Sequence, residues 1–416
     1  MPAMSIWGRR GHRCPATVAA VLLVAPCVAP CTARSQPIAD ESLHQAVAQA
    51  WARLPQRADF QAQENVAAAN HLSGSTFFPN APYLTGQYDD DRFGSNYDYK
   101  TTQAELGTPL WLPGEGTATQ RAANAEAASI GAARQAAHLA LAADVLALTT
   151  NARIALQARD VASQRVSTYT ALSRSAAQRY QVGEGSQSDS LAADAEAASA
   201  SASLEEAQAS LGAAIVALAQ VTGHEAIPTL DAPPPTGQVS LAHDPRIMAA
   251  ERAVAAAAAA ARLVRIQDRD DPELGLQVTN DKQPGSPWDT RVGVVFRLGF
   301  ASEARNAPRR ARAEAAVTRA TVRLLLVRRA VTAAVQAAAL EAGAADRATR
   351  AAERAASALA RRRAQVETAW RLGETPLIEL VRADAAASDA ALARDRAQIR
   401  GRAARLRLAL AEGTLP

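Results

Sequence analysis

The stretch Tyr180-Gln181-Val182-Gly183-Glu184 recurs in the second half of the chain as Trp370-Arg371-Leu372-Gly373-Glu374. The two glycines lie 190 residues apart (373 − 183), and a long alanine-rich segment follows each of them. Glycine tolerates the positive φ that the C-terminal end of a helix requires, so each copy predicts a turn between two helices. The sequence is therefore an internal repeat with one helical turn, or tip, in each copy.

The segment after the first tip has the spacing of a coiled-coil seam. Small and apolar residues alternate four and three positions apart: Ala193, Ala197, Ala200, Leu204, Ala207, Leu211, Ala214, Leu218 and Val221. At the same positions 190 residues later, seven of the nine are again small or apolar, and Arg394 and Gly401 are the departures. So much alanine in a seam predicts helices that pack unusually close together.

A long helical segment also precedes each tip, at 117–181 and 303–371. Each has about 65 residues and would extend about 100 Å as a helix, which is too long for a globular core and suits a tall tube. Ser186 and Thr375-Pro376 have the chemistry of a cap and of first-turn residues for the helices that return from the tips.

Two segments between the helices have a β pattern. Residues 77–112 hold eight of the seventeen aromatic residues, and a Gly/Asn/Asp-rich stretch divides them into two strands. In 272–300, apolar residues alternate on both sides of a turn at 283–287. Alternating strands of about ten residues are the sequence signature of an outer-membrane barrel. A small soluble hairpin domain is the alternative interpretation.

Four strands cannot close a barrel, and lipid does not tolerate the open edge of a sheet. A membrane location therefore requires several copies of the chain. The predicted fold class is mainly α with a small β part, built from long antiparallel coiled-coil helices and two β-hairpins in an internal two-fold repeat.

The predicted organisation begins with a signal peptide at 1–33. A first repeat follows at 34–223, with a helix, a β-hairpin at 77–112 and a helical hairpin whose tip is near 183. A proline-rich linker at 224–239 leads to a second repeat at 240–416, with its β-hairpin at 272–300 and its tip near 373.

The leader has three arginines, a short apolar run at 16–25 and small residues up to Ala33. The run has about ten residues, whereas a membrane-spanning helix needs about 20, and no later segment of that length is free of charge. All three cysteines, Cys14, Cys27 and Cys31, lie in the leader, so the mature chain is expected to have no disulfide and no thiolate metal site. Lipidation is the alternative fate of this region, with Cys31 as its site.

Nothing in the sequence has the pattern of an enzyme. The histidines are scattered without ligand spacing, and there is no phosphate-binding loop and no nucleophile elbow. The net charge of +4 is small, and acids and bases are interspersed, which is typical of solvated helices rather than of a nucleic-acid surface. We therefore expect no catalysis, no cofactor, no resident metal and no nucleic-acid partner.

The order of these features, with the tips Tyr180-Gln-Val-Gly-Glu-Gly-Ser-Gln-Ser-Asp189 and Trp370-Arg-Leu-Gly-Glu-Thr-Pro-Leu-Ile-Glu379, resembles the TolC-like outer-membrane efflux factor family, which serves RND-type efflux. The strand exit Pro109-Leu110-Trp111-Leu112-Pro113-Gly114 is similar to its heavy-metal branch. The resemblance implies a homotrimer with a twelve-stranded barrel in outer-membrane lipid and a periplasmic helical tunnel. It also implies a periplasmic adaptor protein and an inner-membrane RND-type pump as partners.

The resemblance places adaptor contacts at the tips, with Val182, Gly183, Glu184, Leu372, Gly373 and Glu374 as candidates. A plain turn without a partner is the alternative.

It also implies a periplasmic gate, because acids near this position line the closed entrance in the family. The candidates here are Asp189, Asp194, Glu379, Arg382 and Asp384. The alternative is that Asp189 and Glu379 only complement the helix dipole. Arg382 stands where the family often has a second acid, which leaves the sign of the constriction open.

The function predicted from these features is the exit duct of a tripartite efflux system that passes small molecules or metal cations. A periplasmic structural or adaptor-like coiled coil and the duct of a type I protein secretion system are the alternatives.

Overall fold

The computed structural model describes residues 42–94, 97–231 and 243–415. The expected signal peptide, Cys31 and the proline-rich part of the linker at 233–235 lie outside the described residues.

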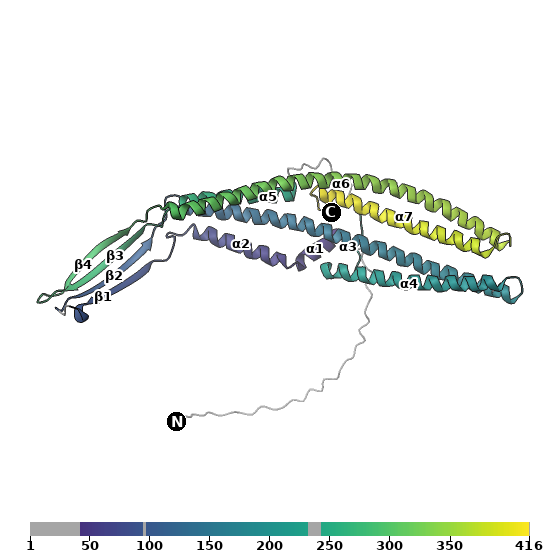
Figure 1. The fold of residues 1–416 in the computed structure, drawn as a ribbon, viewed down its shortest axis with the longest axis horizontal. Coiled ribbons are helices and arrows are strands. Elements are labelled where there is room, and N and C mark those ends of the chain that lie inside the picture. Colours follow the sequence, from purple (N-terminus) through teal and green to yellow (C-terminus); the bar gives the residue numbers. More distant parts are fainter. Residues whose placement is uncertain (1–41, 95–96, 232–242, 416) are drawn as a thin grey trace, which may run out of the picture. The chain divides into compact units, whose positions relative to one another are not determined.

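Four long helices form two antiparallel hairpins (Figure 1). The first consists of α3 (Glu115–Gln181) and α4 (Gln187–Thr222), and the second of α6 (Glu303–Arg371) and α7 (Leu377–Ala411). Helix α6 has the predicted bounds, and α3 begins two residues before the predicted start. The tube-length helices predicted from the sequence are therefore confirmed.

The predicted seam lies on the inner side of both return helices. Ala193, Ala200 and Leu218 are buried on α4, which packs against α3. Ala383 and Ala387 are buried on α7, which packs against α6. Small side chains at most of these positions allow the two helices of each hairpin to pack close together.

The two hairpins are joined through α3 and α7. Gln157 of α3 donates to the Asp395 carboxylate of α7 over 2.9 Å, and Arg165 of α3 forms an ion pair with Asp389 of α7. On the tip side the order of helices is therefore α4, α3, α7, α6, and α4 and α6 are the outermost helices.

The first repeat begins with two helices where the sequence analysis expected one. Helix α1 (Leu43–Arg53) ends at Leu54 in an extended conformation, and α2 (Gln56–Ser73) begins after Pro55. A residue before proline is disfavoured in the helical region, which explains the break. The second repeat has the single helix α5 (Pro245–Ile266) in the corresponding place.

A hydrophobic core lies where α1 meets the long helices. It combines Leu43 and Val47 of α1 with Val145 and Leu146 of α3 and with Leu406 of α7. Helix α3 also holds an 18-residue window with a mean hydropathy of 1.4, long and apolar enough to cross a membrane by composition. After the leader, no apolar segment of about 20 residues is free of charge in the sequence, and 44% of this 18-residue window is buried within the protomer.

The strands form one antiparallel sheet in the order β1 (Tyr83–Asp90), β2 (Lys100–Pro109), β3 (Glu273–Lys282) and β4 (Asp289–Arg297) (Figure 1). The two predicted hairpins are joined by pairing of β2 with β3 along their whole length. The first strand begins at Tyr83 rather than at 77, and the turn at 283–287 is as predicted. In the described residues, β1 and β4 each have a neighbour on one side only.

One face of this sheet is apolar and exposed. Leu84, Leu106, Leu276 and Val294 form a row across all four strands, and their exposed fractions run from 52% to 75%. The opposite face is polar, with Thr85, Glu105, Gln277 and Gly293 in the next row. An exposed apolar face that no part of the described chain covers marks a site of contact with a membrane or with another protein surface.

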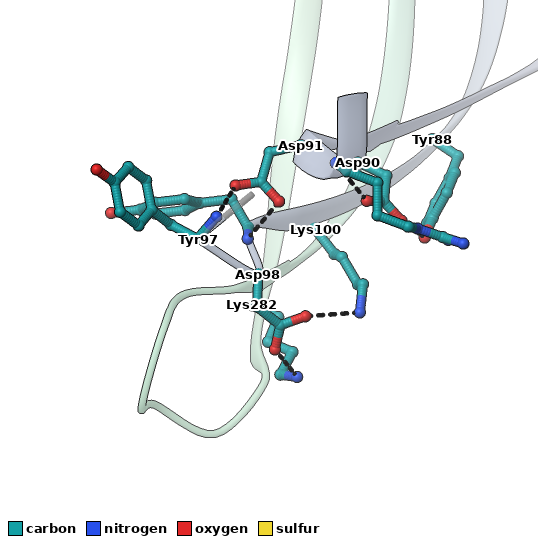
Figure 2. A network of polar contacts seen from close by, with 9 residues as sticks. Tyr88, Asp90, Asp91, Tyr97, Asp98, Lys100 and Lys282 are labelled. Atoms are coloured by element: carbon teal, nitrogen blue, oxygen red, sulfur yellow. Dashed lines mark hydrogen bonds and ion pairs between the residues drawn. The ribbon is translucent and has the colours of Figure 1, made fainter. Parts of the chain in front are cut away.

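An ionic network lies at the end of the sheet that carries the β1–β2 and β3–β4 turns. Lys100 and Lys282, the only lysines of the chain, are direct neighbours on β2 and β3. The carboxylate of Asp98 lies between them and contacts both ammonium groups (Figure 2). Asp91 accepts hydrogen bonds from the backbone N–H groups of Tyr97 and Tyr99 (Figure 2). The network offsets the repulsion between the two lysines and links the hairpins at this end.

A second polar cluster lies at the opposite end, where the strands meet the helices. Glu115, at the first position of α3, is buried and accepts hydrogen bonds from the Leu112 backbone N–H over 3.2 Å and from Gln267 over 2.7 Å. Burial and the nearby negative charge of Glu115 raise the pKa of Asp271 to about 6. These contacts hold the β2–α3 connection against the α5–β3 connection.

Candidate functional site

The two tips have the same backbone geometry. Gly183 and Gly373 have φ values of 79° and 80°. The Glu184 N–H donates to the Arg179 carbonyl over 2.8 Å, and the Glu374 N–H donates to the Ala369 carbonyl over 2.9 Å. Together with the bonds from the two glycine N–H groups, this is the Schellman motif that ends a helix at a left-handed residue. The predicted helical turns are therefore confirmed.

Apolar side chains project from both tips. Val182 is 71% exposed and Leu372 is 70% exposed. The guanidinium of Arg179 lies over the Trp370 ring, 4.4 Å from its centroid, and so connects the first tip to the second. Glu184 and Glu374 are exposed beside the two apolar residues. Each tip thus offers an apolar residue and a carboxylate to solvent.

The two return helices begin differently. The Ser186 hydroxyl accepts a hydrogen bond from the Asp189 N–H over 3.0 Å, so the predicted cap at Ser186 is confirmed. The predicted cap at Thr375 is wrong. Pro376 has an extended ψ of 155°, so α7 begins one residue later than predicted, and Pro376 rather than Thr375 occupies the N-cap position. Within the described part of the chain, the buried Thr375 hydroxyl has no hydrogen-bond partner.

The acids that follow the tips lie in three different environments. Asp189 is exposed in the first turn of α4. Asp194 is also exposed, and it accepts a hydrogen bond from Ser173 over 3.2 Å. Glu379 forms an ion pair of 2.9 Å with Arg382. This pairing reduces the charge that Glu379 presents to solvent.

Asp384 lies inside the protomer, although the equivalent Asp194 is exposed. Only 5% of its surface is exposed, and one carboxylate oxygen lies 2.7 Å from the Arg363 Nε atom of α6. Burial, with the negative charge of Asp384 nearby, raises the pKa of Tyr169 on α3 to about 12. Asp384 therefore holds α7 to its neighbours rather than facing solvent.

A cleft that the sequence analysis missed lies beside Asp384, between α3, α6 and α7. Its volume is about 340 Å³, and Tyr169, Arg363, Trp370 and Asp384 are among the residues that line it. Two aromatic residues in helices that are otherwise poor in aromatics were the signal for it. Among residues 42–94, 97–231 and 243–415, no group of three or more His, Cys, Asp or Glu residues is placed to hold a metal ion.

Solved structures of outer-membrane proteins, channels among them, have this fold. The open state of the Neisseria gonorrhoeae MtrE outer membrane channel is 21% identical, with a TM-score of 0.70 and coverage of 90% of both chains. The Campylobacter jejuni CmeC outer membrane channel is 14% identical, with a TM-score of 0.71, over 90% of this chain and 86% of CmeC. The outer membrane protein VceC of Vibrio cholerae is 18% identical, with a TM-score of 0.68, over 89% of this chain and 96% of VceC.

The fold is thus that of TolC-like outer-membrane channels. Residues 41–224 match the family described as "Outer membrane efflux protein". The match covers most of the first repeat, and the matching family is one of efflux proteins rather than of enzymes. A search of curated proteins found no match.

The tip geometry leads to a first testable prediction. Valine strongly disfavours positive φ, so replacing Gly183 and Gly373 with valine should distort both Schellman turns. A Cβ atom added at either glycine would have no other group within 4 Å, so the effect comes from the backbone and not from a clash. We expect export to be lost while the protein remains in the outer membrane, as measured by drug or metal resistance and by membrane fractionation.

The matched control is Gly131→Val on α3, where the glycine is helical and likewise has open space around it. This control should retain export. Normal resistance in cells that contain only the double tip variant would contradict a role for the tip geometry.

Proposed function

We propose that the protein is the exit duct of a tripartite efflux system and works as a homotrimer. The observation that carries the proposal is the sheet with an exposed apolar face and two open edges, continuous in sequence with two long helical hairpins. An open edge leaves backbone N–H and C=O groups unpaired, which lipid does not permit. Three copies would pair β4 of each with β1 of the next and leave no edge.

The size of the resulting barrel agrees with a duct. Three sheets of four strands give twelve strands (3 × 4). A barrel of about eight strands is filled by its own side chains, so twelve leave an open interior. The apolar row with Leu276 would then face lipid, and the polar row with Gln277 would face the channel.

The helices would continue the channel into the periplasm, and the tips would form its inner end. The exposed Val182 and Leu372, each beside a glutamate, support contact with a periplasmic adaptor protein and, through it, with an inner-membrane RND-type pump. Gly183, Glu184, Gly373 and Glu374 belong to the same surface.

We propose small molecules or metal cations as the cargo. Under threefold symmetry Asp189 and Glu379 would each become a ring of three carboxylates, and such rings favour cations. The Glu379–Arg382 pair weakens one ring, so Asp189 is the stronger contributor. The sequence alone allows two alternatives to an efflux duct. A soluble periplasmic coiled coil would leave the apolar face of the sheet in water. The duct of a type I secretion system would have the same architecture but would carry protein.

Replacing Leu276 with arginine tests the membrane location. Arginine at the midplane of a lipid-facing strand costs about 2–4 kcal/mol. The matched control is Gln277→Arg, the adjacent residue on the polar face. We expect the Leu276 variant to be depleted from carbonate-washed outer membranes and to lose efflux, while the control retains both. Equal amounts of the two variants in the membrane would contradict the barrel.

The proposed gate is tested by conductance in planar bilayers. Neutralising both acids, with Asp189→Asn and Glu379→Gln, should reduce the preference for potassium over chloride and weaken block by multivalent cations. Asp384→Asn is the control, since this carboxylate is buried within the protomer and should not affect ion selectivity. If the double variant keeps the selectivity of the unmodified channel, the two acids only stabilise the N-terminal ends of their helices by complementing the helix dipole.

A further inference from the structure

The two outermost helices on the tip side carry opposite charge. Helix α4 has five acids and no lysine, arginine or histidine. The equally long tip half of α6, residues 336–371, has seven arginines and four acids, a net charge of +3 (7 − 4). The other two helices of this region, α3 and α7, lie between them.

On α6 the arginines of the tip half form a stripe that faces away from the rest of the protomer. The exposed residues recur three and four positions apart, as in a coiled-coil seam: Arg347, Arg350, Arg354, Ser357, Arg361 and Ala364. We call these six residues the α6 stripe. No ion pair is formed by its four arginines within the described residues. Three acids on this part of α6 have partners on α7. Asp346 and Glu341 pair with Arg405 and Arg407, and Glu353, which is exposed, accepts a hydrogen bond from Gln398.

Helix α4 has a matching exposed stripe, opposite its buried seam. Its members are small, apolar or acidic and again recur four and three apart: Leu191, Ala195, Ala198, Ala202, Glu205, Ala209, Gly212 and Val216. We call these eight residues the α4 stripe. Asp194 and Glu206 are adjacent to it in sequence and are also exposed. In the described residues, Glu205 and Glu206 have no cationic partner.

The acids of α4 and the arginines of α6 also lie at similar distances from their tips. At 1.5 Å per residue, Glu205 lies about 27 Å from the start of α4, and Arg354 lies about 26 Å from the end of α6. Asp194 and Glu196 lie about 11–14 Å from the start of α4, and Arg361 and Arg362 lie about 14–15 Å from the end of α6. Arginine side chains span the remaining differences. The small residues of the α4 stripe leave room for them.

We propose that the α6 stripe of one protomer docks on the α4 stripe of a second copy of this chain, in an interface held by arginine–carboxylate pairs. The proposal rests on the proposed trimeric duct. With the helices in the order α4, α3, α7, α6, a ring closes only when α6 of one copy meets α4 of the next, in a head-to-tail contact. Each closure places positive against negative charge, whereas α4 against α4 or α6 against α6 would place like charges together.

Cysteine crosslinking tests this contact in the assembled protein. We pair Ala198→Cys with Arg361→Cys, which lie at about the same distance from their tips. Oxidation of outer membranes should give a covalent trimer on a non-reducing gel. Each single-cysteine variant should stay monomeric on that gel, and so should Ala198→Cys combined with Arg347→Cys, since Arg347 lies about 20 Å farther along.

Charge reversal provides a second readout that a merely structural effect would not reproduce. Arg350→Glu with Arg354→Glu should lower the temperature at which the trimer dissociates in detergent. Adding Glu205→Arg and Glu206→Arg to the same chain should restore it, because both sides of each contact are then reversed.

The failure of this interface is distinguishable from the failure of the duct. If trimers and export are normal but the crosslink does not form, the docking of the stripes is wrong and the proposed duct is unaffected. The same holds if the reversed acids do not restore the stability of the trimer. Crosslinking of Arg361→Cys to a different protein would assign the α6 stripe to that partner and would also overturn the proposal. Absence of any trimer from the unmodified chain would overturn both.

Discussion

The unpaired backbone at the outer edges of β1 and β4 is the constraint on which the other features depend. Within the described sheet each of these strands has one neighbour, while its outward-facing apolar residues demand an environment without water. Lipid supplies that environment but cannot satisfy the edges. In the proposed trimer, neighbouring copies of the chain pair these edges, and the helices attached to each sheet then also meet around the same axis.

The open sheet edges arise from the internal repeat, because the two repeats together supply only four strands to the described sheet. Each repeat contributes two strands and one helical hairpin. A single protomer therefore consists of two approximate units, joined by the pairing of β2 with β3 and by the packing of α3 against α5 and α7. The repeats are alike at the backbone of the tips and differ in their side chains. Asp194 is exposed whereas Asp384 is buried against Arg363, and α4 has no arginine whereas its counterpart α7 has seven. These differences make the contact inside a protomer unlike the contact proposed between protomers.

Much of this fold could be predicted because its signals are local. Glycine at 183 and 373 reports a positive φ, and the 3–4 spacing after each tip reports a buried helix face. The sequence was less informative where neighbouring residues or elements determine a helix start or the burial of a side chain. The hydroxyl of Thr375 resembles a cap, but the extended ψ of Pro376 starts the helix one residue later. The burial of Asp384 depends on α3 and α6, which lie far from it in sequence, so the spacing that suggested a gate could not reveal it.

The most direct test of the central claim is the mass of the protein extracted from outer membranes in mild detergent, measured together with its β-sheet signal by circular dichroism. Closure of the sheet between copies predicts a mass of three chains, with the β signal retained as long as the trimer persists. A stable particle with the mass of one chain and an undiminished β signal would contradict it, because the edges of β1 and β4 would then remain open in an apolar environment.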